Sequence, residues 1–240
     1  MWCLSSKESV IAIAGGVENT APGGLARGVE SALALAGLVA ASPVLLLAGA
    51  AVAATSPGPV LFRQQRVGLG GRPFTLLKLR TMKVAPEGSQ LTAAGDSRIT
   101  PVGRWLRRFK LDELPQLWNV VRGDMSLVGP RPEVPRYVDL ADPLWRQVLS
   151  ARPGLTDPVT LRLRDEEALL SGVGDVERYY RERLLPWKLR GYRDYLSRRT
   201  WTTDLGVLGA TALAVLRLRR PAQPGRAEIE AGDAGGDQGR

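Results

Sequence analysis

An uncharged stretch of 25 residues, Ser31 to Thr55, limits what this 240-residue chain can fold into more than any other feature. As a helix it would be about 37 Å long, more than the roughly 30 Å of a bilayer's hydrocarbon core. Ser42 and Pro43 lie near its middle. Pro43 cannot donate to the carbonyl of Val39 and its ring crowds that turn, so the sequence predicts a sharp bend. We expect Ser42 to compensate by bonding back to the carbonyl of Leu38.

Three structures are compatible with this segment. A kinked helix would span a membrane, a re-entrant hairpin with arms of about twelve residues would enter and leave on one side, and an Ala-rich helix would be buried in a soluble protein. The dense basic residues from Arg63 onward favour a cytoplasmic position for the C-terminal part of the chain, whereas the flank with Arg27 and Glu30 is nearly neutral. These arguments leave the hairpin and the span open.

The charge and the rare residues limit the chemistry. The chain has 33 Lys and Arg against 24 Asp and Glu, and residues 63–120 contain eleven basic and four acidic side chains. Such a basic block indicates a nucleic acid, a membrane surface or a phosphorylated substrate. There is no histidine and only one cysteine, Cys3, which excludes imidazole chemistry, an intramolecular disulfide and a Cys-rich zinc site. Acid–base or covalent chemistry must therefore rest mainly on carboxylates.

The segment after residue 57 predicts a small α/β domain that is mostly helical. Residues 60–62 and 74–79 read as two strands of a hairpin around Gly68, Gly70 and Gly71. Apolar residues at helical spacing predict two short helices, 102–109 and 114–121. Farther on, 179–199 and 205–216 predict helices that lie on a membrane face or pack on the core, and the residues from 218 to 240 predict a disordered tail.

An adjacent acid pair, Asp112 and Glu113, lies between the two short helices. Nearby cations depress a carboxyl pKa below its usual value of roughly 4, so both acids are expected to be ionised and well placed to meet a phosphate. Asp112 is the expected N-cap of the second helix, with Pro115 in its first turn. In the simpler interpretation, Asp112 is only a cap and Glu113 only a solvated acid. The surrounding cations are Arg98, Arg104, Arg107, Arg108, Lys110, Arg122 and Arg131.

Three ordered segments carry a resemblance to a known family: SPGPVLFRQQRVG, PFTLLKLRTM and RITPVGRWLRRFKLDELPQLWNVVRGDMSLVGPRPE. Behind an apolar segment broken by Ser-Pro, they resemble the bacterial sugar transferases, the monotopic polyprenyl-phosphate phosphoglycosyl transferases, from about Arg27 to Leu216. The resemblance implies transfer of a sugar 1-phosphate from a UDP-sugar to undecaprenyl phosphate, with release of UMP and use of Mg²⁺. It implies a cytoplasmic catalytic domain at the bacterial inner membrane.

The resemblance also assigns residues. Asp112 falls on the family's nucleophilic aspartate, Glu113 on its partner, and Arg107 and Arg131 on its phosphate-binding arginines, with Pro132 beside the latter. The pair Ser42 and Pro43 falls on the family's re-entrant helix break, which favours the hairpin and places both its ends in the cytoplasm. We expect the compact form of the family, divided into a flexible leader 1–26, a re-entrant helix 27–56, a catalytic domain 57–217 with interfacial helices, and the tail 218–240.

The chemistry leads to specific roles. Attack by Asp112 on the sugar-bearing phosphorus would give an aspartyl phosphosugar and needs no base. The acceptor is a phosphate monoester with a second pKa near 6, so we expect Glu113 to hold Mg²⁺ and position the acceptor more than to remove a proton. Asp124 is a third metal candidate. Further substrate-binding candidates are Lys78, Arg80, Arg98 and Arg164.

Arg164 is assigned by counting from Pro153-Gly154 to the arginine of a family pattern. The glycine, tryptophan and glutamine of that pattern are absent here, so the transferred sugar stays undecided. An alternative is that Arg162 and Arg164 pair with the acids that follow them on the surface. Membrane lipid is an expected partner, a homo-oligomer is compatible, and no nucleic acid is expected.

Two other classes of protein remain as alternatives. A membrane-anchored nucleic-acid binder would explain the charge but not the acid pair or the Ser-Pro break, and it would bind DNA in a salt-sensitive way that Asp112→Asn leaves unchanged. A catalytically silent scaffold is opposed by the intact acid pair and arginines.

Overall fold

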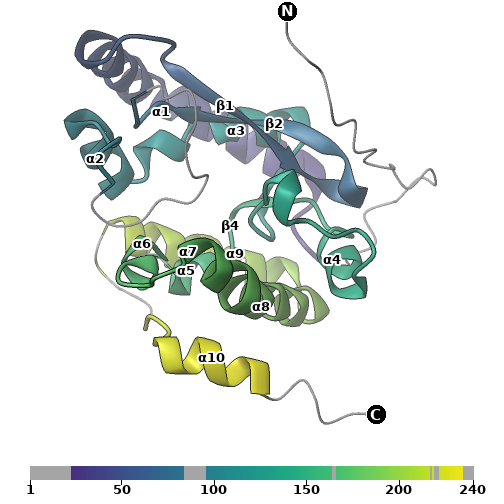
Figure 1. The fold of residues 1–240 in the computed structure, drawn as a ribbon. Coiled ribbons are helices and arrows are strands. Elements are labelled where there is room, and N and C mark those ends of the chain that lie inside the picture. Colours follow the sequence, from purple (N-terminus) through teal and green to yellow (C-terminus); the bar gives the residue numbers. More distant parts are fainter. Residues whose placement is uncertain (1–22, 84–95, 164–165, 217, 219–221, 235–240) are drawn as a thin grey trace, which may run out of the picture.

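The computed structural model describes residues 23–83, 96–163, 166–216, 218 and 222–234, and within them the chain is mostly helical with two small two-stranded sheets (Figure 1). Most of the expected leader and the end of the tail lie outside these residues. The elements are α1 (Arg27–Thr55), β1 (Leu61–Val67), β2 (Pro73–Leu79), α2 (Pro101–Arg108), α3 (Gln116–Arg122), β3 (Ser126–Val128), α4 (Pro143–Val148), β4 (Gly154–Thr156), α5 (Pro158–Arg162), α6 (Glu166–Leu170), α7 (Val176–Tyr179), α8 (Leu185–Ser197), α9 (Trp201–Val215) and α10 (Arg226–Ala234). Short 3₁₀ turns cover Leu69–Gly71, Leu111–Glu113 and Pro135–Tyr137, and a π-helical turn covers Tyr180–Leu184.

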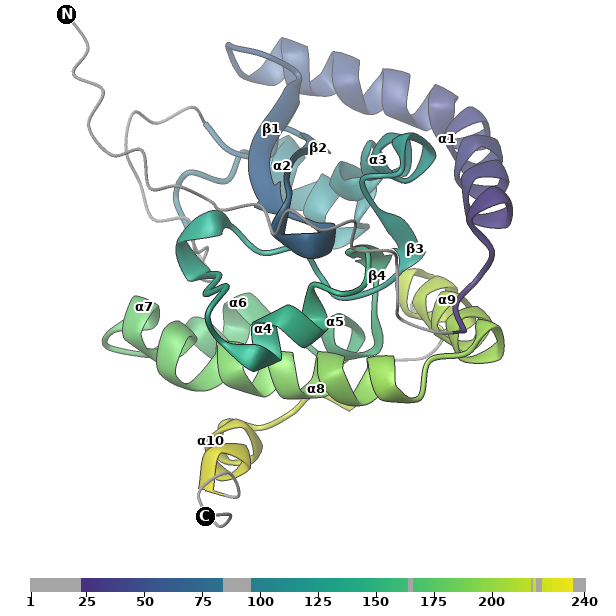
Figure 2. The ribbon, with the colours of Figure 1, turned by 90° about the vertical axis from the view of Figure 1, so that its right-hand side faces the viewer.

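Helix α1 is continuous over 29 residues, and Figure 2 shows that it bends near its middle, where the sequence predicts a bend at Pro43. Ser42 Oγ donates to Val39 O at 2.7 Å rather than to Leu38 as expected. The reason is that Val39 is the residue whose carbonyl loses its donor at Pro43. The helix is long and apolar enough to cross a membrane. Only 11% of its most apolar 18-residue stretch is buried, whereas the core helix of a soluble protein is mostly buried.

One side of α1 is nevertheless part of the domain. Near its start, Ala34 packs against α3 and β2, and Gly37 faces Leu117, whose Cδ1 would lie at an ordinary contact distance of 3.6 Å from an added Cβ. Near its end, Ala48 and Val52 pack against β2 and α2. The small side chains of Ala34 and Ala48 therefore let α3, β2 and α2 pack directly on this helix.

The predicted hairpin is confirmed. Strands β1 and β2 pair antiparallel from Leu61 opposite Leu79 to Val67 opposite Pro73. The turn between them needs glycine because Gly70 and Gly71 have φ of 64° and 80°. Strand β1 is longer than expected, since it continues to Val67 beyond residue 62.

The two short helices predicted around the acid pair are α2 and α3. A second sheet was not predicted: β3 and β4 pair in parallel, with Ser126 opposite Gly154 and Val128 opposite Thr156. The chain at Gly154 passes very close to Gly129, since a Cβ added to Gly154 would lie only 2.1 Å from Gly129 N. Only glycine fits at position 154.

The C-terminal helices differ in what they bury. Five residues of α8 are buried, so this helix packs on the core. This was the alternative to the prediction that it lies on a membrane face. Helix α9 instead exposes Trp201, Leu205 and Leu213. Helix α10 corrects the prediction of a wholly disordered tail: Ile229 is fully buried in the core, and Arg226 donates to Leu169 O at 3.0 Å.

Candidate active site

The acid pair lies on a tight connection between α2 and α3. Lys110 has a left-handed backbone with φ of 56°, and the 3₁₀ turn Leu111–Glu113 follows it. Helix α3 begins only at Gln116, with Pro115 in the N-cap position. The prediction that Asp112 caps this helix is therefore wrong, because the 3₁₀ turn separates the two. Asp112 is instead turned inward and only 5% exposed.

Glu113 is held by two of the predicted cations. Its Oε1 accepts from Lys78 Nζ at 2.9 Å and from Arg131 at 2.7 Å. Burial alone would raise the pKa of Glu113, but the charges of Arg131, Lys78 and Lys110 hold it well below its usual range. In return, the charge of Glu113 raises the pKa of Arg131, and burial lowers that of Lys78. Glu113 is therefore a fixed anion between two cations.

Asp112 behaves in the opposite way. Burial raises its pKa, and the neighbouring charge of Glu113 raises it further, against weaker opposition from Lys78, Lys110 and Arg107. The expectation that both carboxyl pKa values are depressed is therefore wrong for Asp112. Its Oδ1 is buried and has no hydrogen-bond partner among the described residues. A buried carboxylate oxygen without a donor is costly for the fold, and such a group is typical of a functional site.

The other predicted substrate-binding residues are more scattered. Arg107 forms an ion pair with Glu167 at 2.9 Å. Arg98 forms one with Asp96 at 2.6 Å. Arg80 is 5% exposed and donates to the carbonyls of Ser56 and Pro57 at 2.6 Å each, so its bonds join β2 to the end of α1. Arg164 lies outside the described residues. The structure thus brings Lys78 and Arg131 directly to the acid pair, whereas Arg80 and Arg98 bond elsewhere.

The predicted three-carboxylate metal site does not form. No group of three or more His, Cys, Asp or Glu side chains that could hold a metal occurs within the described part of the chain. Asp124 is instead held beyond the end of α3, where its Oδ2 lies 3.2 Å from Asn119 Nδ2 and 3.5 Å from Arg122. Two oxygens of the acid pair have no protein donor among the described residues. Asp112 Oδ1 has no hydrogen-bond partner, and Glu113 Oε2 is left because Lys78 and Arg131 both bond to Oε1. Mg²⁺ commonly takes one or two carboxylates plus substrate phosphates, which fits this donor set.

A supporting network behind Arg131 was not predicted. Arg66 donates to Pro132 O at 3.0 Å and to Glu133 Oε1 at 3.3 Å, and Tyr180 donates to the other oxygen of Glu133. These contacts fix the loop that carries Arg131 and Pro132. Arg66 stands in one of the quoted segments, but nothing in its local pattern indicates a partner 67 residues away.

A model of the family described as bacterial sugar transferase matches residues 23–218. The chain is 43% identical over 182 residues to a UDP-glucose:undecaprenyl-phosphate glucose-1-phosphate transferase of Caulobacter vibrioides, covering 73% of this chain and 63% of that protein. It is 45% identical over 108 residues to a putative undecaprenyl-phosphate N-acetylgalactosaminyl 1-phosphate transferase of Bacillus subtilis, covering 44% of this chain and 60% of that protein.

A third relative is a UDP-N-acetylgalactosamine-undecaprenyl-phosphate N-acetylgalactosaminephosphotransferase of Aeromonas hydrophila. It is 42% identical over 135 residues, which cover 54% of this chain and 32% of that protein. The chain therefore spans less than two thirds of the length of each of these relatives.

Proposed function

This chain belongs to the bacterial sugar transferase family, and from that premise we propose that it transfers a sugar 1-phosphate from a UDP-sugar to undecaprenyl phosphate and releases UMP. The relatives named for this reaction support the class of donor and acceptor. The product would be a lipid-linked sugar that begins a surface polysaccharide or glycoconjugate.

One observation carries the proposal: Asp112 presents a buried oxygen without a donor beside a glutamate that two cations hold ionised. No protein donor holds this oxygen, so the carboxylate of Asp112 is not committed to a contact within the fold. Lys78 and Arg131 lie where the negative charge of a diphosphate needs compensation. Their positions explain how an anionic nucleophile and an anionic substrate can share one site.

In the first step, Asp112 attacks the sugar-bearing phosphorus of the donor. The new bond joins an Asp112 oxygen to phosphorus, the bond from that phosphorus to the bridging oxygen breaks, and UMP leaves with the bonding electrons. In the second step, a phosphate oxygen of the acceptor attacks the same phosphorus and Asp112 leaves. Because neither nucleophile needs to lose a proton at neutral pH, no histidine is required.

Asp112 and Glu113 are the residues that would hold Mg²⁺, together with substrate phosphates. When bound, the ion would neutralise charge on the diphosphate. Within the chain, Glu113 keeps Lys78 and Arg131 in place, and the Arg66–Glu133–Tyr180 contacts hold the loop beneath Arg131.

The membrane position follows from α1. We place this helix in the cytoplasmic leaflet of the bacterial inner membrane as a hairpin bent at Pro43, with the domain on the cytoplasmic side. Its exposed residues support contact with lipid, since Val39, Leu46 and Leu47 are 66%, 74% and 74% exposed. Trp201 and Leu205 on α9 would lie at the same surface.

The test is UMP release by the purified full chain in lipid nanodiscs with undecaprenyl phosphate. UDP-glucose and UDP-N-acetylgalactosamine are the first donors to try, because relatives are named for them. Asp112→Asn should abolish release, and Asp124→Asn, the same chemical change outside the site, should retain release and its Mg²⁺ dependence. Full release by Asp112→Asn, or no release from any UDP-sugar by the unmodified protein, would rule the proposal out.

A further inference from the structure

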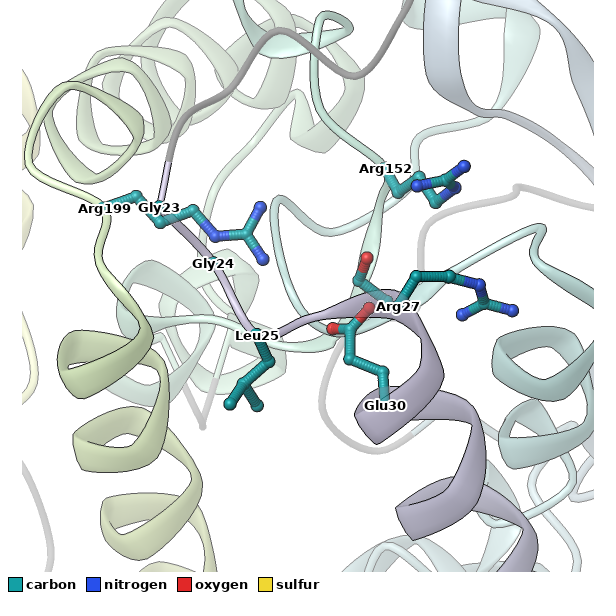
Figure 3. A pocket seen from close by; sticks show the side chains of 8 residues that line it. Gly23, Gly24, Leu25, Arg27, Glu30, Arg152 and Arg199 are labelled. Atoms are coloured by element: carbon teal, nitrogen blue, oxygen red, sulfur yellow. The ribbon is translucent and has the colours of Figure 1, made fainter.

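A small polar cavity lies at the start of α1, beyond the end of α3 that is opposite to the acid pair. It has a volume of about 140 Å³, and charged side chains reach it from three parts of the chain (Figure 3). Arg27 and Glu30 come from the first turn of α1, Arg152 from the segment before β4, and Arg199 from the turn after α8. No part of the proposed transfer reaction uses this cavity.

Two of these four charges are satisfied within the protein. Arg199 is paired with Asp204 at 2.9 Å, with side chains that are 3% and 0% exposed. Glu30 accepts from Leu127 N at 3.1 Å. Their roles are structural, since they fasten α9 and β3 to the start of α1.

Arg27 and Arg152 are different because, among the described residues, neither has a carboxylate within the 4.0 Å of an ion pair. Both bond to main-chain carbonyls at the end of α3: Arg27 to Val121 O at 3.2 Å and to Val120 O, Arg152 to Gly123 O at 3.2 Å. Arg152 donates only through Nε, so its two terminal nitrogens have no acceptor in the described part of the chain. Figure 3 shows Arg152 and Arg199 on different sides of the cavity.

Burial and then the charge of Arg152 lower the pKa of Arg27, and the charge of Glu30 on the same cavity opposes this less strongly. A bound anion would therefore relieve the repulsion between the two arginines. A guanidinium group with free terminal N–H groups matches the oxygens of a phosphate in geometry and charge. With α1 in the membrane as proposed above, its first turn lies at the level of the lipid headgroups. Basic pockets beside membrane helices on the cytoplasmic side are suited to anionic headgroups.

We propose that this cavity binds the phosphate of an anionic phospholipid headgroup through Arg27 and Arg152. The proposal rests on the proposed membrane position of α1 but not on the transfer chemistry. The bound headgroup would fix the depth of α1 and stabilise the contact between α1 and α3.

The test is thermal unfolding of the full chain in phosphatidylcholine nanodiscs with an increasing fraction of phosphatidylglycerol. A ligand that binds only the folded state raises the midpoint in a saturable way. Arg152→Gln should need an about five-fold higher phosphatidylglycerol fraction for the same rise in the unfolding midpoint. This factor is the loss of affinity expected when one arginine near a lipid surface is removed. Arg198→Gln is the matched control, with the same change of charge on an exposed neighbour outside the cavity, and should leave the titration unchanged.

An equal shift in Arg152→Gln and Arg198→Gln would mean that only the general charge of the surface matters, and would overturn the proposal. The proposal would also be overturned if inorganic phosphate raised the unfolding midpoint in pure phosphatidylcholine and phosphatidylglycerol did not. The bound anion would then be free phosphate and not a lipid headgroup. If Arg152→Gln does not fold, Arg152→Lys keeps the charge without the planar fork and should still shift the titration, while an unchanged titration contradicts the site. UMP release is measured separately, so failure of the transferase proposal does not affect this result.

Discussion

Basic side chains gather at both ends of α3, but they have different partners there. Before the start of the helix, Lys78 and Arg131 meet the side-chain carboxylate of Glu113. Beyond its end, Arg27 and Arg152 meet main-chain carbonyls, which carry the negative end of the helix dipole. A stretch of only seven residues separates the two arrangements.

This difference is the reason we propose that the chemistry takes place at the acid pair. At the acid pair, Lys78 and Arg131 hold Glu113, and the buried oxygen of the neighbouring Asp112 has no donor. A buried oxygen without a donor lowers the stability of the fold, which is common at functional sites. At the other end, the same residue types complete the last turn of a helix and attach it to α1. Removing a charge should therefore reduce activity at one end and stability or lipid binding at the other.

The largest effect is expected at Arg131. Arg131→Gln removes a cation that would compensate the diphosphate in the proposed reaction, and loss of one such group typically lowers the rate by about 100-fold to 1,000-fold. The UMP-release rate of the folded variant measures it. Because the variant also loses the ion pair with Glu113, the unfolding midpoint should fall as well. Arg152→Gln serves as the comparison at the far end and should keep kcat within about two-fold, because it lies outside the acid-pair site.

The next effect is on stability, at Arg27. Arg27→Gln leaves the carbonyls of Val120, Val121 and Met125 without their charged donor. Hydrogen bonds from a charged group contribute about 1.5–3 kcal/mol, so we expect a loss of about 2 kcal/mol in the free energy of unfolding. Chemical denaturation in nanodiscs measures this. A variant as stable as the parent, with Arg198→Gln as the surface reference, would show that these bonds do not hold the end of α3.

A smaller gain in stability is expected at Asp112. Because its folded-state pKa is raised, folding takes up a proton there, and its contribution to stability is favourable at low pH and lost as pH rises through the raised pKa. Asp112→Asn removes the buried charge and should raise the free energy of unfolding at pH 8 by about 1 kcal/mol, a typical gain when a functional group is neutralised. The gain should shrink as the pH falls toward 4, and a constant gain would contradict the assignment.

The smallest effect concerns the pH dependence of the activity that a Glu113→Gln variant retains. In the proposed reaction Asp112 must be ionised to attack, so the acid limb of the kcat/KM profile should follow its raised pKa. Burial and the charge of Glu113 both raise that pKa, so Glu113→Gln should move the limb to lower pH. Initial rates between pH 4 and 8 measure the limb; a shift to higher pH would mean that another group controls it.

The sequence predicted those features that depend on neighbours in the chain. The bend at Pro43, the hairpin around Gly70 and Gly71 and the two short helices each have a local cause, and the structure contains all of them. The acid pair was found in the same way. Arg131 was named through the family resemblance and Lys78 as a substrate-binding candidate, but their contacts with Glu113 were not predicted, since contacts across 35 and 18 residues leave no periodic signal.

The errors have physical causes as well. The pKa of Asp112 was predicted from the number of cations nearby, but burial is the larger influence and cannot be counted from sequence. Strands β3 and β4 have three residues each, too few for an alternating pattern. In the described part of the tail, Ile229 is buried, and its partners come from α8 and the turn before it. Asp124 appeared close to the acid pair in the chain, but α3 carries it to the opposite end.

The central claim is that Asp112 becomes covalently attached to the phosphosugar. Incubation of the full chain with UDP-sugar and Mg²⁺, without acceptor, followed by acid quench and peptide mass spectrometry, tests it directly. The account predicts an adduct of one sugar phosphate on the peptide that contains Asp112, absent from Asp112→Asn and discharged by undecaprenyl phosphate. Turnover with no adduct in the parent protein, or an adduct at another residue that persists in Asp112→Asn, would contradict it.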